Sequence, residues 1–216
     1  MVTLVFGAGG HALELVAIAQ RSGVLDVGDS EVRFVIGSAA APRRSELPFP
    51  VITESQIIGF LRGQAVRVIL AVGAGPLRSR IDAELVKLGI TVEFPNIIDP
   101  TTVTLGPLAP ANGLVTFPHT FVSERVTFGR HCHLNVGSSI SHEAVLGDFV
   151  TVSPQAVICG RARIGALSFI GANATVIDGV HVVAETTIGA GSTVVCALTQ
   201  PGTYVGAPAR AIRTRP

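Results

Sequence analysis

The stretch "NVGSSISHEAVLGDFVTVSPQAVICG", residues 135–160, places a large apolar side chain at every sixth position, beginning with Ile140. The spacing extends in both directions to thirteen residues: Val122, Phe128, Leu134, Ile140, Leu146, Val152, Ile158, Ile164, Ile170, Val176, Val182, Ile188 and Val194. Because apolar residues make up roughly half of ordinary chains, such a run has a chance probability on the order of 10⁻³. A period of six fits neither a helix at about 3.6 nor one long strand at about 2.

A six-residue period does fit a chain that turns a corner every six residues, with three faces to a coil. The large residue then fills the interior of the prism, and the residue four places later sits where the corner is tight. That later residue is small at Cys132, Ser138, Ala144, Ala156, Ala162, Ser168, Ala174, Thr186 and Ser192. This hexapeptide pattern predicts a parallel β-helix over residues 97–205, followed by a tail over 206–216.

Residues 1–96 have a different pattern, in which apolar runs alternate with helical segments. The pattern predicts strands at 2–6, 32–37 and 66–75, and helices at 11–23, 55–62 and 76–89. Gly23 is a suitable stop for the first helix, and Pro76 suits the start of the last. Strands separated by helices in this order predict a small parallel α/β domain of Rossmann-like type.

Composition narrows the class of protein. The chain has 216 residues, a net charge of +1 and 14% charged residues, so nothing favours a nucleic acid or a membrane surface as partner. The N-terminus lacks the basic region of a signal peptide, and no run of about 18 apolar residues would insert in a bilayer. Cys132, Cys159 and Cys196 are odd in number without CxxC spacing, which favours unpaired thiols and a cytoplasmic location.

His142 and Glu143 stand side by side within the repeat. A neutral imidazole near pH 7 suits a general base, and a carboxylate on its other ring nitrogen would fix the tautomer. Adjacent residues on a flat strand point to opposite faces, so their contact requires a corner, which the six-residue lattice supplies. The alternative is a pair of polar residues on a solvated corner.

The motif "GAGGH", residues 7–11, opens the first predicted helix. Free N–H groups at a helix N-terminus suit a diphosphate. Gly7, Gly9 and Ala12 also fit the dinucleotide fingerprint, but Gly37 and Ser38 stand where a nicotinamide site needs an acidic residue, which argues against that cofactor. The alternative is a tight strand–helix turn with a capping histidine.

The hexads, with "VFGAGGHALELV", "NIIDPTTV", "SHEAVLGDF" and "YVGAPARAI", resemble the left-handed β-helix acyltransferases, the hexapeptide-repeat family, and in particular its bacterial sugar acyltransferases of the PglD/NeuD type. The resemblance implies a homotrimer that binds acetyl-CoA as co-substrate between neighbouring β-helices, with no permanently bound cofactor. It implies acetylation of the amine of a nucleotide-linked amino sugar, whose nucleotide the N-terminal domain holds.

By the same resemblance, His142 is the general base, Glu143 orients it, and the Gly160 backbone N–H meets the oxyanion. The residues implied for the acceptor are Gly7, Gly9, Gly10 and His11. Those implied for acetyl-CoA are Gly160, Arg161, Ala172, Ala190 and Pro208.

The chain departs from that family at several positions. Relatives tend to have acidic residues that touch the nucleoside where Gly37 and Ser38 lie, a second active-site histidine where Thr151 lies, and "HP" where this chain has Asp99 and Pro100. The first departure leaves the nucleotide open.

The sequence is also compatible with other functions. Within the enzyme class, the chain would acetylate a sugar hydroxyl or use another acyl-CoA; outside it, the chain would be a non-catalytic trimer that binds a nucleotide or carbohydrate.

Arg78 and Arg80 suit phosphates or, more ordinarily, a solvated helix face. The histidines and thiol at His119, His131, Cys132, His133 and His181 invite a zinc hypothesis, but their spacings match no structural zinc pattern, and no metal is expected.

Overall fold

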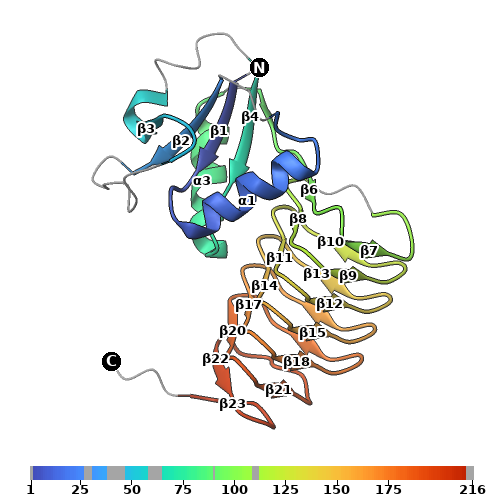
Figure 1. The fold of residues 1–216 in the computed structure, drawn as a ribbon. Helices are drawn as coiled ribbons and strands as arrows, with labels where there is room; N and C mark the ends of the chain where they lie inside the picture. Colours follow the sequence, from blue (N-terminus) through green and yellow to red (C-terminus); the bar gives the residue numbers. More distant parts are fainter. Residues whose placement is uncertain are drawn as a thin grey trace.

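The computed structural model describes residues 2–26, 31–37, 47–57, 65–89, 91–108 and 112–212. An α/β part at the N-terminal end sits on one end of a long solenoid of short strands (Figure 1). Most of the helix predicted at 55–62 lies outside the described residues, apart from the single turn η1 (Glu54–Gln56).

The α/β part contains one parallel sheet with the strand order β3-β2-β1-β4-β5. Its strands are β1 (Val2–Phe6), β2 (Val32–Ile36), β3 (Val51–Thr53), β4 (Val66–Leu70) and β5 (Val92–Glu93). The sheet is accompanied by the helices α1 (Gly10–Arg21) and α3 (Gly75–Lys87). The three predicted strands and both long helices are confirmed, except that the strand predicted at 66–75 ends at Leu70 and Gly75 already belongs to α3.

The helix boundaries follow the residues that the sequence offers. Gly23 adopts φ +73°, and the Val24 amide donates to the Ala19 carbonyl, so α1 ends in a left-handed cap. Pro76 lies in the first turn of α3, where its missing N–H costs nothing.

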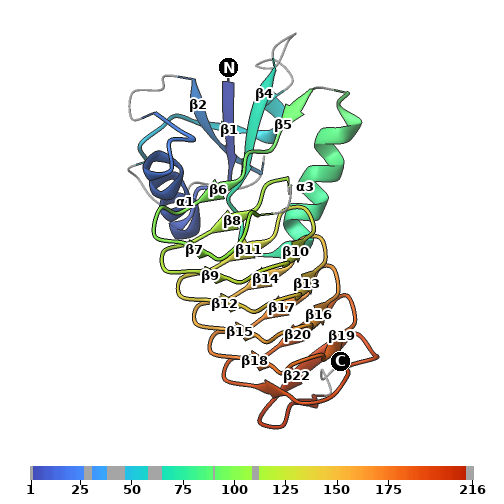
Figure 2. The ribbon, with the colours of Figure 1, turned by 90° about the vertical axis from the view of Figure 1, so that its right-hand side faces the viewer.

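The solenoid has three parallel sheets that run along its length, seen as three columns of strands in Figure 2. The first holds β7 (Val103–Thr104), β9 (Phe121–Val122), β12 (Ser139–Ile140), β15 (Val157–Ile158), β18 (Thr175–Val176) and β21 (Thr193–Val194). The second holds β10 (Thr127–Phe128), β13 (Val145–Leu146), β16 (Arg163–Ile164) and β19 (His181–Val182). The third holds β6 (Ile97–Ile98), β8 (Val115–Thr116), β11 (His133–Leu134), β14 (Thr151–Val152), β17 (Phe169–Ile170), β20 (Thr186–Ile188), β22 (Gly202–Val205) and the antiparallel β23 (Arg210–Ala211).

Each coil of the solenoid spans three hexads. Strands pair with their equivalents on the next coil, as Ser139 does with Val157 and Ile140 with Ile158. All thirteen large residues of the hexad series are buried, and so are the nine small residues four places after them. The predicted parallel β-helix, with large residues filling its interior, is confirmed.

The corners of the solenoid have a left-handed backbone conformation that the hexapeptide pattern did not predict. At six-residue intervals from Gly113 to Gly191, φ is positive, and ten of these residues are not glycine. A left-handed residue costs about 1 kcal/mol or more. The corner amides regain hydrogen bonds to the preceding coil, as where Glu143 donates to the Glu124 carbonyl and Arg161 to the His142 carbonyl.

The α/β part is joined to the solenoid through Arg78, which is completely buried. Its guanidinium donates hydrogen bonds of 2.8–3.3 Å to the carbonyls of Val72, Gly73, His131, Phe149 and Val150 and to the Thr151 hydroxyl. The expectation of a solvated or phosphate-binding Arg78 is wrong, because α3 lies against the solenoid. Arg80, also on α3, is largely exposed.

Among the described residues, no helix has both the length and the apolar character needed to cross a membrane.

Candidate active site

His142 follows β12 at a corner of the solenoid, where its side chain is about half exposed. Glu143 occupies the left-handed position of that corner, with φ +61°. The corner turns two neighbouring side chains towards each other, which a flat strand would not do.

The Glu143 carboxylate is shared between two partners. One oxygen lies 2.7 Å from the Arg125 guanidinium, one coil earlier, and the other lies 3.8 Å from His142 Nδ1. The second distance is longer than a hydrogen bond. Glu143 therefore lies beside the imidazole as a charge that Arg125 holds in place.

Gly160 lies directly against the His142 ring. A Cβ on this residue would stand 2.5 Å from His142 Cε1 and 2.7 Å from Nε2. The Gly160 carbonyl accepts from the Gly179 amide, whereas its own N–H has no hydrogen-bond partner within the described part of the chain. An unused N–H on a residue that lies against an imidazole ring is available as a donor to an oxyanion formed next to a base.

Asp178 lies one coil beyond Gly160 and was not among the residues predicted for the site. Its Oδ1 would be 2.8 Å from a Cβ on Gly160, and its other oxygen pairs with the Arg161 guanidinium. The signal for it was the step of three hexads from His142 to Gly160, which when repeated leads to Asp178. Arg161, expected to meet coenzyme phosphates, is thus engaged by a carboxylate in this structure.

The remaining residues predicted for acetyl-CoA lie elsewhere on the lattice. Ala172 and Ala190 are separated by one coil and stand before β18 and β21, whereas Gly160 and Arg161 follow β15. The two groups therefore occupy opposite edges of the sheet that contains β12, β15 and β18. Pro208 stands a further three hexads along the chain from Ala190, next to the final hairpin.

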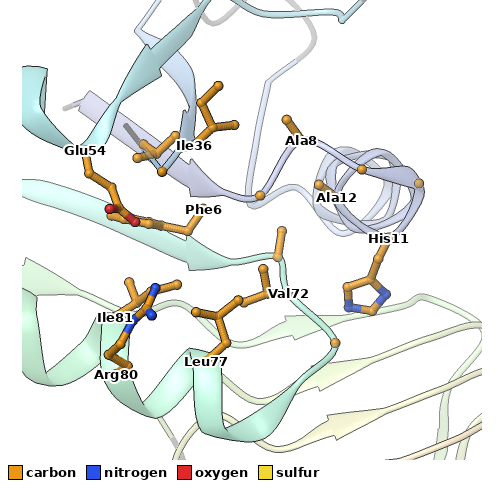
Figure 3. Close-up of a pocket in the computed structure, with 17 residues that line it drawn as sticks. Phe6, Ala8, His11, Ala12, Ile36, Glu54, Val72, Leu77, Arg80 and Ile81 are labelled. Atoms are coloured by element: carbon orange, nitrogen blue, oxygen red, sulfur yellow. The ribbon is translucent and has the colours of Figure 1, made fainter. Parts of the chain in front are cut away.

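A cavity of about 520 Å³ lies in the α/β part at the carboxyl ends of β1, β2 and β4 (Figure 3). Gly7, Gly9 and Gly10, the glycines predicted to bind the acceptor, line it, and α1 begins at Gly10. Gly7 has φ +115°, and a Cβ there would lie 2.6 Å from the Ala71 carbonyl oxygen, so only glycine fits this turn.

His11 lines the same cavity, but its ring is turned away from it (Figure 3). The imidazole stacks on Phe117, and its Nε2 lies 3.4 Å from His133 Nδ1. Burial, and then the charge of Arg78, lowers the pKa of His11 to about 4, so the ring is neutral at pH 7. It makes no hydrogen bond that caps α1, whose N-cap is Gly9.

Two charged residues line the cavity: Arg80, which the sequence offered as a candidate for phosphates, and Glu54, which was not predicted. Glu54 and Arg80 line opposite sides in the view of Figure 3, with Phe6 between them. Glu54 stands near Gly37, the position where a nucleoside-binding acid was expected and not found, whereas Ser38 lies outside the described residues. No spacing rule links Glu54 to the glycine motif.

Two histidines of the zinc hypothesis, His131 and His133, lie at the junction between the two parts, whereas His119 and His181 are exposed on the solenoid. His131 and His133 are buried at the junction, and His131 stacks on Phe149. Burial is the first cause that lowers the pKa of both, to about 3 for His131. The described residues contain no group of three or more histidine, cysteine, aspartate or glutamate side chains placed to hold a metal ion.

No family model matches the chain. It is 24% identical over 181 residues, 82% of this chain and 78% of the relative, to a GDP-perosamine N-acetyltransferase from Escherichia coli O157:H7. It is 28% identical to the acetyltransferase domain of PglB from Neisseria gonorrhoeae FA1090 in complex with acetyl coenzyme A, covering 97% of this chain and 98% of that one, with a TM-score of 0.84.

PerB from Caulobacter crescentus, solved with CoA and GDP-perosamine, is 25% identical, with 99% of this chain and 98% of that chain covered and a TM-score of 0.85. The perosamine N-acetyltransferase of Caulobacter crescentus has also been solved as variants in which one histidine is replaced by alanine or by asparagine.

Proposed function

We propose that the chain, which is similar to a GDP-perosamine N-acetyltransferase and to the acetyltransferase domain of PglB, transfers the acetyl group of acetyl-CoA to the amino group of a nucleotide-activated amino sugar. The observation that carries this proposal is the stacking of His142 against Gly160, whose amide N–H is unused within the described residues. A base and an oxyanion donor on successive coils are the two groups that attack on a thioester needs.

In the proposed mechanism, neutral His142 removes a proton from the acceptor amine as its nitrogen attacks the thioester carbon. The carbonyl oxygen becomes an oxyanion and accepts a hydrogen bond from the Gly160 N–H. When the tetrahedral intermediate collapses, the carbon–sulfur bond breaks, and the departing CoA thiolate takes the proton from the His142 imidazolium.

Glu143 is a positioning residue in this scheme. Its carboxylate, held by Arg125, lies on the Nδ1 side of the ring and stabilises the imidazolium that forms when Nε2 accepts the proton. The 3.8 Å separation closes to a hydrogen bond by a small rotation of either side chain, as catalytic contacts often do when substrates bind.

The transfer needs no covalent acyl-enzyme. Cys159 precedes Gly160, but burial and then the nearby Asp178 raise the pKa of its thiol, so the thiolate is disfavoured at pH 7. Direct attack in a ternary complex therefore agrees best with the groups present.

The two substrates occupy different parts of the molecule in this proposal. Residues 1–96 form a Rossmann-like domain that holds the nucleotide of the acceptor with Gly7, Gly9, Gly10 and the main chain of His11. Residues 97–205 form a left-handed β-helix that holds acetyl-CoA with Gly160, Arg161, Ala172 and Ala190, and Pro208 contributes from the tail over residues 206–216.

We also propose a homotrimer. Val136, Phe169 and Val195 are large apolar residues exposed at different places on the solenoid, and neighbouring subunits on two sides would cover exposed apolar side chains of this kind. Light scattering after size-exclusion chromatography tests this proposal, and a monomer at micromolar concentration would contradict it.

The function is tested by the release of CoA thiol from acetyl-CoA in the presence of UDP-, dTDP- or GDP-linked amino sugars. We expect release with one nucleotide class, and a drop of about 10²- to 10⁴-fold in His142→Ala. His181→Ala is the matched control, because His181 is an exposed histidine on another sheet of the solenoid. An undiminished rate in His142→Ala would remove His142 as the base, and no release with any of the three would refute the acceptor class.

A further inference from the structure

An acidic residue, Glu54, lies in the α/β cavity at a position that the sequence pattern does not predict. β2 and β3 pair in parallel with Ile36 opposite Thr53, so the next register positions bring Glu54 beside Gly37. A Cβ on Gly37 would lie 4.0 Å from Glu54 Oε2. The carboxylate that nucleoside sites place at the end of the second strand is therefore supplied here by the neighbouring strand.

The position of Glu54 is fixed by its own turn. The Thr53 amide donates to the Gln56 side chain at 2.8 Å, which holds η1 against the end of β3. Within the described residues, the Glu54 carboxylate has neither a hydrogen-bond donor nor a cationic partner. Figure 3 shows it directed over Phe6 into the cavity. A carboxylate held in this way is free to accept hydrogen bonds from a ligand.

An apolar pocket of about 170 Å³ adjoins the cavity at this point and shares Phe6, Glu54 and Ile81 with it. Ile57, Leu85 and Leu88 supply its other apolar walls, and Glu84, which pairs with Arg80, also lines it. The shared residues therefore form a place where a flat ring can contact apolar side chains while its polar edge faces Glu54. The glycine turn and the start of α1 lie at the other end of the cavity, where they suit the diphosphate.

The two oxygens of a carboxylate both accept hydrogen bonds, so a base that engages both of them presents two neighbouring N–H donors. Guanine does so with its N1–H and its exocyclic amino group. Uracil and thymine present one N–H flanked by carbonyl oxygens, which a carboxylate repels. Adenine and cytosine place their amino group beside a ring nitrogen that only accepts.

We propose that Glu54 selects a guanine nucleotide by accepting hydrogen bonds from the N1–H and amino group of the base. This inference rests on the proposed function for the location of the nucleotide, and it adds the identity of the base and the residue that recognises it.

The test is calorimetric titration of the full chain with GDP, IDP and UDP. IDP differs from GDP only in lacking the exocyclic amino group, so it isolates one of the two hydrogen bonds. We expect GDP to bind the wild type about tenfold or more tightly than IDP, and UDP to bind more weakly still.

Glu54→Gln replaces one accepting oxygen by an amide that donates. The difference between GDP and IDP should then fall below about threefold, while Glu14→Gln, an exposed control on α1 with the same change of charge, should keep the wild-type difference. Thiol release with each nucleotide sugar is measured in parallel.

Equal binding of the three nucleotides, or a GDP preference that persists in Glu54→Gln, would overturn the assignment of Glu54. If thiol release with a UDP- or dTDP-linked sugar were then observed, the proposed function would stand without it. If no nucleotide bound at all, the inference would fail, and thiol release would decide the proposed function independently.

Discussion

The solenoid corner at His142 and the α/β cavity at Glu54 bring their residues together by different means. His142, Gly160 and Asp178 follow one another at intervals of three hexads, the length of one coil, so their positions in the sequence place them in one stack. Glu54 meets Gly37 because β3 pairs with β2, and no period connects the two residues. In a regular repeat, the number of residues between two positions determines where they lie in the fold. In a parallel sheet whose crossover connections vary in length, it does not.

The largest effect is expected where the two parts meet. Arg78→Ala would remove a buried side chain and leave several carbonyl oxygens of both parts without a donor, so we expect a loss of about 3–5 kcal/mol in the free energy of unfolding. Denaturant unfolding measures it. Arg80→Ala, on the exposed side of the same helix, should cost less than about 0.5 kcal/mol. Equal effects of the two changes would contradict the structural role of Arg78.

A substitution at Gly160 distinguishes the proposed catalytic role of this residue from its role in the solenoid fold. Alanine stands at the equivalent corner position at Ala172 and Ala190, so the solenoid tolerates a Cβ there. At Gly160 that Cβ would displace the His142 ring. We expect Gly160→Ala to lose about 10²- to 10³-fold in kcat with an unchanged melting temperature. A double variant with His142→Ala should lose little more than either single change. Full activity in Gly160→Ala would refute the stacking of catalytic groups.

The buried histidines at the junction, His131 among them, predict that the folded protein loses stability at acidic pH. The pKa of His131 in the folded protein, about 3, lies below its ordinary value of 6.5, so the unfolded chain binds more protons between these values. Stability is therefore complete above about pH 6.5 and falls as the pH is lowered, by about 2 kcal/mol at pH 5 from His131 alone. Denaturant unfolding at pH 7 and pH 5 measures the change. His131→Phe, which keeps a ring beside Phe149, should reduce the pH dependence, and an unchanged slope would contradict this origin.

A smaller effect is expected at Glu143. Because its carboxylate lies 3.8 Å from His142 Nδ1, Glu143→Gln should lower kcat about tenfold and leave the KM for acetyl-CoA near its wild-type value. Arg125→Met should lower kcat by only a few-fold, since the Arg125–Glu143 pair is exposed to solvent. If Arg125→Met had the larger effect, Arg125 would act directly on a substrate.

The solenoid and the position of His142 next to Gly160 could be predicted from the sequence alone. The six-residue period identified the buried series, and the step of three hexads stacked His142 on Gly160, because each hexad makes the same local strand and corner. The glycine motif likewise located the cavity, since a strand, a tight turn and a helix start are local structures.

The contacts between distant segments required the folded structure. Tertiary packing turned His11 towards Phe117, buried Arg78 in the junction, and placed Glu54 in the position that Gly37 leaves open. The physical reason is that these contacts depend on strand pairing and on the packing of α3 against the solenoid. Neither leaves a regular spacing in the chain.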